Sequence, residues 1–338
     1  MKAVMYLRPG IGLREVDEPQ IQNPDDVKIK IDYASICGSD THMIQGEWDD
    51  EYLEPLIIGH EAAGVITEIG PEAKIKGLKV GDKVAVYHSE YYGKCFFCRN
   101  GQEHLCTNKR VFAACMAEYV VAAEQVVHKL PDGVDTLRGC MSEPISTCLH
   151  GVDLLDVRPG TSVAIYGAGG LGLLMIQLLR MAGATDITVI EPIEAKRQKA
   201  LALKADHVLD PRDEDFIAKA RAITNGRGFE RIMEISGSTM AAEAALKTIS
   251  RGGKIVYFAN YIPNYHLPVD MFRFVNDEIT ISGIYQSPYV FPRVMSILPK
   301  LDLRDQTEAI YPIENIEEAW EAHMSKRYPK IVLKVSKD

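Results

Sequence analysis

The stretch SVAIYGAGGLG, residues 162–172, decides the fold of this chain. A strand-like run leads into a glycine-rich turn, and the apolar run from Leu171 to Ala182 has the length of a helix. In such a turn Gly167 permits a sharp bend, Gly169 lets the backbone approach a pyrophosphate, and Gly172 allows close helix packing. The phosphates would lie at the helix N-terminus, where free N–H groups and the helix dipole favour anions. The stretch therefore predicts a dinucleotide-binding loop.

An acidic residue, Glu191, ends the next expected strand, Ile187–Glu191. At this position a carboxylate accepts hydrogen bonds from the adenosine ribose and repels a 2′-phosphate. We therefore expect NAD, with NADP the less favoured alternative that the nearby Lys196 and Arg197 leave open. The candidate cofactor-binding residues are Gly167, Gly169, Gly170, Leu171, Gly172, Glu191 and Arg197.

Strands and helices alternate from residue 162 to residue 282. Further strands are expected at His207–Leu209, Arg231–Ile235, Lys254–Phe258 and Glu278–Ser282, and helices at Ala195–Leu203, Glu214–Thr224 and Met240–Ile249. Strands interleaved with helices of this length indicate βαβ units and a parallel sheet. A membrane span would fit within Ser162–Ala184 by length, but a strand, a loop and a helix explain its glycines better.

Residues 1–134 are instead strand-like and irregular. Val27, Ile29 and Ile31 alternate with polar residues, which predicts a half-buried strand. The tail contains an amphipathic helix, Ile316–Met324, and a last strand, Lys330–Val335, and we expect it to fold back on the first half. The expected α/β organisation is a β-rich catalytic domain (1–150), a doubly wound dinucleotide-binding domain (151–285) and a C-terminal return (286–338).

Composition limits the classes of partner. The 338 residues are 46% hydrophobic and 25% charged, which is typical of a globular chain of two domains. A net charge of −9 argues against nucleic acid and anionic membrane surfaces. The seven cysteines are odd in number and no signal peptide is evident, so we expect reduced thiols and a cytoplasmic location.

Three separate segments carry candidate metal ligands. They are Cys37-Gly38-Ser39-Asp40, Gly59-His60-Glu61 and Glu143-Pro144. One cysteine, one histidine and one or two carboxylates form a catalytic zinc site with an open position. The alternative is that Cys37 is a small core hydrophobe and His60 a hydrogen-bonded core residue. Zinc together with a nicotinamide cofactor favours hydride transfer between an alcohol and a carbonyl compound.

These motifs resemble the medium-chain, zinc-dependent alcohol dehydrogenase family over essentially the whole chain. The stretch Glu143-Pro144-Ile145-Ser146 is similar to the branch that contains sorbitol and threonine dehydrogenases. The resemblance implies a GroES-like catalytic domain, a Rossmann domain and a homo-oligomer, either a dimer or a tetramer. It also implies that Cys37 and His60 hold zinc, and that Glu61 and Glu143 share the carboxylate role, one as the direct ligand.

The same resemblance implies a path for the proton. Ser39 would hydrogen-bond the substrate oxygen, and His42 would pass the proton onward through the nicotinamide ribose. Asp40 is placed to orient a ligating imidazole through its other nitrogen. The candidate catalytic residues are thus Ser39, His42 and Glu143.

Two regions depart from the family pattern. The structural-zinc lobe of the family has four cysteines, whereas this chain has Cys95, Cys98 and Cys106, with Tyr92 in place of the first. We expect a lobe that has lost its metal or holds it loosely, with help from His88, Glu90 or water. After Gly283 this chain lacks the arginine that reaches substrate hydroxyls in polyol dehydrogenases, which argues against sorbitol itself.

The expected function is therefore NAD-linked oxidation of a secondary alcohol to the ketone. The substrate class is a polyol, a sugar-derived alcohol or a hydroxy-amino compound. Two alternatives remain: an aldehyde or ketone reductase that uses the same chemistry in reverse, and a non-catalytic nucleotide-binding protein on the same fold. The histidines other than His42 and His60 are interpreted as structural or surface residues.

Overall fold

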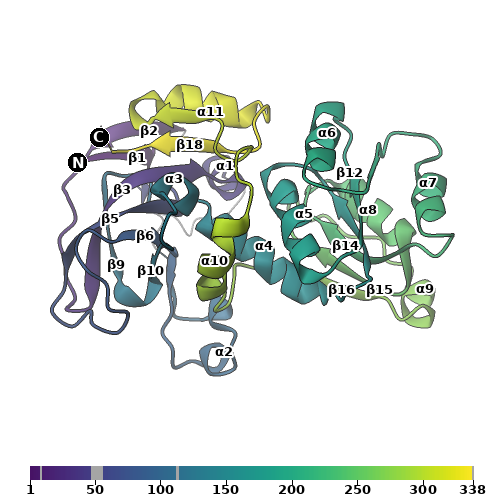
Figure 1. Cartoon of the computed structure of the whole chain (residues 1–338), viewed down its shortest axis with the longest axis horizontal. Helices are drawn as coiled ribbons and strands as arrows, with labels where there is room; N and C mark the ends of the chain where they lie inside the picture. Colours follow the sequence, from purple (N-terminus) through teal and green to yellow (C-terminus); the bar gives the residue numbers. More distant parts are fainter. Residues whose placement is uncertain (8–9, 47–55, 112–113, 337–338) are drawn as a thin grey trace. The chain divides into compact units, whose positions relative to one another are not determined.

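The computed structural model describes residues 1–7, 10–46, 56–111 and 114–336. These residues form two compact units (Figure 1). One unit comprises Met1–Ser146 and Pro288–Asp338, and the other comprises Thr147–Ser287. The divisions fall a few residues from the boundaries expected at 150 and 285.

The first unit is built on a mixed sheet with the spatial order β10-β6-β5-β3-β18-β17, and β9 also pairs with β3. These strands are β3 (Asp26–Ile36), β5 (Glu61–Ile69), β6 (Lys83–Val86), β9 (Tyr119–Ala123), β10 (Val127–Lys129), β17 (Ile310–Pro312) and β18 (Ile331–Lys334). Smaller sheets join β1 (Lys2–Tyr6), β2 (Ile11–Glu15) and β4 (Leu56–Ile57), and β7 (Ser89–Glu90) with β8 (Arg110–Val111). The last strand, β18, runs antiparallel to β3, so the C-terminal segment belongs to the N-terminal sheet.

Strand β3 is more deeply buried than its alternating sequence predicts. It pairs with β5, β9 and β18, so that little of its length is left at an edge. Even Lys28 is only 7% exposed. Its ammonium group pairs with Glu18 at 2.6 Å and lies 5.5 Å from the ring centroid of Tyr119. The prediction of a half-buried strand was therefore wrong at Lys28, because a lysine can lie buried along a sheet when an acid meets its amine.

The second unit is an α/β domain with a six-stranded parallel sheet in the order β13-β12-β11-β14-β15-β16. The strands are β11 (Ser162–Tyr166), β12 (Asp186–Ile190), β13 (His207–Leu209), β14 (Phe229–Glu234), β15 (Ile249–Tyr257) and β16 (Thr280–Gly283). The chain order reverses beside β11, which is the place where open parallel sheets bind ligands at their carboxyl ends. This is the doubly wound fold that the sequence predicts.

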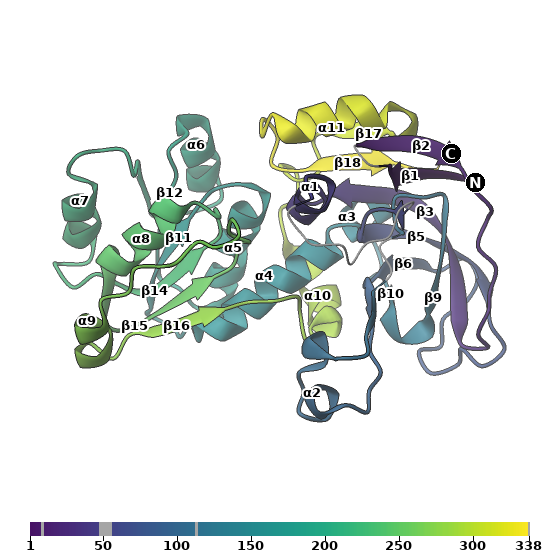
Figure 2. The same ribbon diagram turned by 180° about the vertical axis from the view of Figure 1, so that it is seen from behind.

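The helices that flank the strands are visible from both sides in Figures 1 and 2. They are α1 (Gly38–Ile44), α2 (Phe96–Arg99), α3 (Thr136–Gly139), α4 (Ser142–Leu155), α5 (Gly170–Ala182), α6 (Glu194–Ala202), α7 (Phe216–Ile223), α8 (Thr239–Thr248), α9 (Met271–Asn276), α10 (Phe291–Ile297) and α11 (Ile316–Met324). Within the described ranges, none combines the length and apolarity needed to cross a bilayer. The segment Ser162–Ala184 is a strand, a glycine turn and helix α5, as the glycines indicate.

Candidate active site

Two local structures bring the first ligands into position. Cys37 ends the β3 segment and is the N-cap of α1, with its backbone N–H donating to Asp40 Oδ2 at 2.9 Å. His60 follows Gly59, which has a φ of +91°. A Cβ at Gly59 would lie 2.4 Å from Met116 Cγ, so no larger residue fits there. The glycine before the histidine is thus required by packing and by backbone geometry.

Cys37, His60 and Glu61 are brought together as the sequence predicts. One ligand atom from each lies within 4.8 Å of the others. Glu61 is 1% exposed, while the cysteine and histidine are partly accessible. A thiolate, an imidazole and a carboxylate at this spacing are the donor types that zinc prefers in catalytic sites, so these residues fit the metal that the family implies.

Asp40 orients the imidazole of His60. Its Oδ1 lies 3.4 Å from His60 Nδ1, and its carboxylate is 3% exposed. With Nδ1 directed to Asp40, Nε2 is left to face a ligand, 3.3 Å from Ser39 Oγ. Burial alone would lower the pKa of His60, but the charges of Cys37 and Asp40 raise it well above its ordinary value. The site thus gathers negative charge that a cation would offset.

Glu61 has two partners that the sequence does not indicate. Lys330 Nζ lies 2.5 Å from Glu61 Oε2 and 2.6 Å from Oε1, and the Ser35 hydroxyl also donates to this carboxylate. Burial would lower the pKa of Lys330, but Glu61 raises it, so the lysine is charged. Glu61 is therefore a carboxylate with its negative charge already compensated in part.

The second predicted carboxylate, Glu143, is in the first turn of α4. Its Oε1 lies 3.6 Å from His88 Nδ1, and the His88 ring packs edge-on against His60 with centroids 5.3 Å apart. Burial raises the pKa of Glu143 to about 7. His88 was interpreted from the sequence as structural or surface; it is 7% exposed and adjoins the site instead. No spacing signal pointed to it, because His88 lies outside both ligand motifs.

Ser39 and His42 share helix α1. The described contacts place the Ser39 hydroxyl at His60 Nε2, whereas those of His42 leave its role a prediction. The helix is held from the C-terminal segment by Thr41 Oγ1, 3.0 Å from His323 Nε2.

The three-cysteine lobe also forms a compact group. One sulfur from each of Cys95, Cys98 and Cys106 lies within 4.8 Å of the others, with Cys95 and Cys98 3.4 Å apart. Backbone N–H groups of Cys98 and Thr107 lower the pKa of Cys95. Thiolates at such spacing fit a soft metal, but among the described residues this group contains no fourth ligand.

The substitutes considered for the fourth ligand are engaged elsewhere. Glu90 Oε1 accepts from the Ala123 N–H at 3.0 Å, and its Oε2 lies 3.5 Å from Arg110. His88 faces Glu143, and Tyr92 is 50% exposed. Apolar packing within the lobe is also weak, because Phe96 is 72% exposed.

The glycine loop has the geometry of a phosphate-binding turn. Gly167 has a φ of +109°, and a Cβ at Gly172 would lie 2.2 Å from the Gly167 carbonyl oxygen. In contrast, a Cβ at Gly169 would meet no protein atom within 4 Å. Gly169 is also the N-cap of α5 and has no side chain to cap it. The space beside Gly169 and the free N–H groups of α5 fit a nucleotide pyrophosphate.

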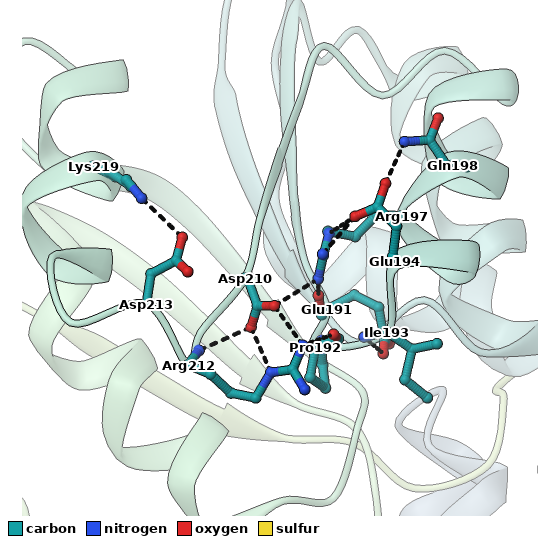
Figure 3. A network of polar contacts seen from close by, with 10 residues as sticks. All are labelled: Glu191, Pro192, Ile193, Glu194, Arg197, Gln198, Asp210, Arg212, Asp213 and Lys219. Atoms are coloured by element: carbon teal, nitrogen blue, oxygen red, sulfur yellow. Dashed lines mark hydrogen bonds and ion pairs between the residues drawn. The ribbon is translucent and has the colours of Figure 1, made fainter.

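The acid at the end of β12 is part of the loop structure as well. Glu191 Oε2 accepts from the Ala168 N–H at 2.9 Å and Oε1 from the Ile193 N–H at 3.0 Å. Arg197 donates to the Glu191 carbonyl oxygen at 2.6 Å and pairs with Glu194 and Asp210 (Figure 3). Glu191 and Arg197 are thus neighbours, and the guanidinium group is already held by acids.

Comparison with known proteins gives the same family from both halves of the chain. Residues 23–132 match the alcohol dehydrogenase GroES-like domain, and residues 170–299 match the zinc-binding dehydrogenase family. L-Threonine 3-dehydrogenase of Pyrococcus horikoshii is 37% identical over 269 residues, which is 77% of this chain and 76% of that protein. D-Arabitol-phosphate dehydrogenase of Enterococcus avium is 30% identical over 98% of this chain and 97% of that protein.

A solved structure shares the whole fold. A zinc-binding dehydrogenase from Clostridium scindens superposes with a TM-score of 0.93 at 32% identity, and 99% of each chain is covered. Family membership supports zinc and a nicotinamide cofactor for this chain. The chain belongs to the zinc-dependent, medium-chain alcohol dehydrogenase family and is an oxidoreductase.

Proposed function

We propose that this oxidoreductase is NAD-linked and oxidises a secondary alcohol to the ketone. The observation that carries the proposal is the convergence of Cys37, His60 and Glu61, with the imidazole held by Asp40. Glu143, beside His88, is the second carboxylate of the site. The glycine loop and Glu191 support the nucleotide part of the proposal.

The residues of the site divide the chemistry between them. Zinc held by Cys37, His60 and a carboxylate would supply a Lewis acid that favours the ionised alcohol. A nicotinamide cofactor would accept the hydride. Ser39, whose hydroxyl lies at His60 Nε2, is placed to hydrogen-bond the substrate oxygen and accept its proton. His42, in the next turn of α1, then carries the proton towards solvent.

The substrate class that we propose is a polyol, a sugar-derived alcohol or a hydroxy-amino compound. Relatives named for threonine and for arabitol phosphate support this range. The missing arginine after Gly283 argues against sorbitol. We also propose a cytoplasmic homo-oligomer, since all seven cysteines are free thiols and the family resemblance implies a dimer or tetramer.

A panel of such alcohols, measured by NADH absorbance, tests the activity. Cys37→Ser and exhaustive chelation should each abolish turnover, while ADP-ribose binding to the glycine loop persists. Initial rates in both directions separate a dehydrogenase from a reductase. If Cys37→Ser retained most of its turnover, the metal mechanism would be wrong. A chain that binds ADP-ribose but turns over none of the panel with either cofactor would favour a non-catalytic role.

A further inference from the structure

Asp210 joins two arginines beside the expected cofactor site. It follows strand β13, and its side chain is 15% exposed. Its Oδ2 accepts from Arg197 Nη1 at 3.0 Å and from Arg212 Nη2 at 2.6 Å. Its Oδ1 accepts from Arg212 Nε at 2.9 Å and from the Arg212 backbone N–H at 3.0 Å. One carboxylate thus holds both guanidinium groups (Figure 3).

Both guanidinium groups are anchored on the turn that begins with Glu191. Arg197 donates to the Glu191 carbonyl oxygen at 2.6 Å, and Arg212 donates to the carbonyl oxygen of Pro192. Glu191 is the acid expected to receive the adenosine ribose. The two cations therefore lie where an additional phosphate on that ribose would be recognised, since arginine is the residue that accommodates a 2′-phosphate.

The two arginines differ in how firmly they are held. Arg197 is 12% exposed and pairs with Glu194 at 2.5 Å as well as with Asp210. Arg212 is 69% exposed, and Asp210 is the acid that its guanidinium contacts in the described structure. Removing the charge of Asp210 would therefore release Arg212 more completely than Arg197.

We propose that Asp210, with Glu191, makes this site reject NADP, and that Arg212 and Arg197 form a latent 2′-phosphate site that Asp210 neutralises. The inference rests on the proposed nucleotide role of the glycine loop. A phosphate entering here would meet the charge of Asp210 and would have to compete with it for both guanidinium groups. Asp210 is thus a specificity-determining residue that acts through the arginines.

The test uses ligands without a nicotinamide, so that it does not depend on zinc or on turnover. Binding of ADP-ribose and of 2′-phospho-ADP-ribose to the full chain is measured by calorimetry. Asp210→Asn should tighten binding of the phosphorylated ligand about tenfold or more, which corresponds to at least about 1.4 kcal/mol. Binding of ADP-ribose should change less than twofold.

Asp215→Asn is the matched control. It removes the same charge in the same region, but its carboxylate pairs with Lys219 at 2.9 Å and not with either arginine. It should leave the ratio of the two affinities unchanged. In Asp210→Asn/Arg212→Ala most of the gain should disappear, because the released cation is gone.

Each other outcome has a distinct meaning. An unchanged ratio in Asp210→Asn, or a gain of equal size in Asp215→Asn, would overturn the proposal. So would loss of ADP-ribose binding in Asp210→Asn, because Asp210 would then support the pocket rather than select the ligand. If the wild-type chain bound neither ligand, the nucleotide role in the proposed function would fail first.

Discussion

Asp40 holds two candidate zinc ligands with its two carboxylate oxygens. Oδ1 lies 3.4 Å from His60 Nδ1, and Oδ2 accepts the backbone N–H of Cys37 at 2.9 Å. A single buried side chain therefore fixes the direction of the imidazole and the turn that carries the thiol. The relationship makes the geometry of the metal site depend on a residue that is not itself a ligand.

Asp40→Asn should weaken zinc binding by a factor of roughly 10–100, because the neutral amide orients and polarises the imidazole less well. Competition with a chromophoric chelator measures the affinity, and the absorption of the Co²⁺-substituted protein reports the geometry. Asp17→Asn, at an exposed position, is the control for the loss of one charge. An affinity equal to that of the wild type would show that His60 is oriented without Asp40.

Lys330→Met should destabilise the metal-free protein by about 3 kcal/mol or more, because Glu61 would be left as a buried charge without its cation. Denaturant unfolding gives the free energy. The double variant Lys330→Met/Glu61→Gln should recover much of the loss, since the uncompensated charge is gone. Additive effects of the two substitutions would mean that the ion pair contributes little.

Glu143 should make the metal-free protein less stable as the pH rises. Its pKa is raised from 4.5 to about 7 by burial, so the folded state retains a proton that the unfolded state has lost. Stability from this group is therefore full below pH 4.5 and is lost between about pH 4.5 and pH 7. The loss approaches about 3 kcal/mol.

Glu143→Gln removes this titration and is the comparison for that measurement. The difference in unfolding free energy between wild type and variant should change steadily across the same pH interval. A difference that stays constant from pH 4.5 to pH 7.5 would place the pKa of Glu143 near its ordinary value.

His42→Ala should slow alcohol oxidation most below neutral pH, where solvent bases cannot replace the imidazole. Added imidazole should restore part of the rate. His207→Ala, a half-exposed histidine of the other unit, controls for general effects on the protein. A pH–rate profile identical to that of the wild type would place His42 outside the proton path.

The three-cysteine lobe should hold zinc weakly, because three thiolates leave one tetrahedral position to water. Elemental analysis of dialysed protein should give nearer one zinc per chain than two. Tyr92→Cys should raise the content towards two and slow proteolysis of the lobe. Two tightly held zinc ions in the wild type would require a fourth ligand that the described residues do not provide.

The fold could be predicted because its signals are local. The glycine turn after Ser162–Tyr166 and the alternation of strands with helices specify a parallel sheet without reference to distant residues. Asp40 could also be assigned, since it lies three residues after Cys37 in the same turn.

The partners of the site could not be predicted in the same way. Lys330 reaches Glu61 only because β18 returns to pair with β3, and His88 reaches Glu143 from a segment between two sheets. Neither contact follows from periodicity or from spacing within a motif. The burial of Lys28 has the same origin, because its acid partner, Glu18, comes from outside the strand.

The ion pair between Glu61 and Lys330 spans 269 positions of the chain. During synthesis, β5 leaves the ribosome long before β18, so the carboxylate emerges without its cation. The first unit can close its sheet only after the whole nucleotide-binding unit has been made, because its own last strands follow Ser287. Metal loading with native geometry is therefore a late event in the life of the nascent chain, and damage to the C-terminus reaches a centre whose ligands all lie far upstream.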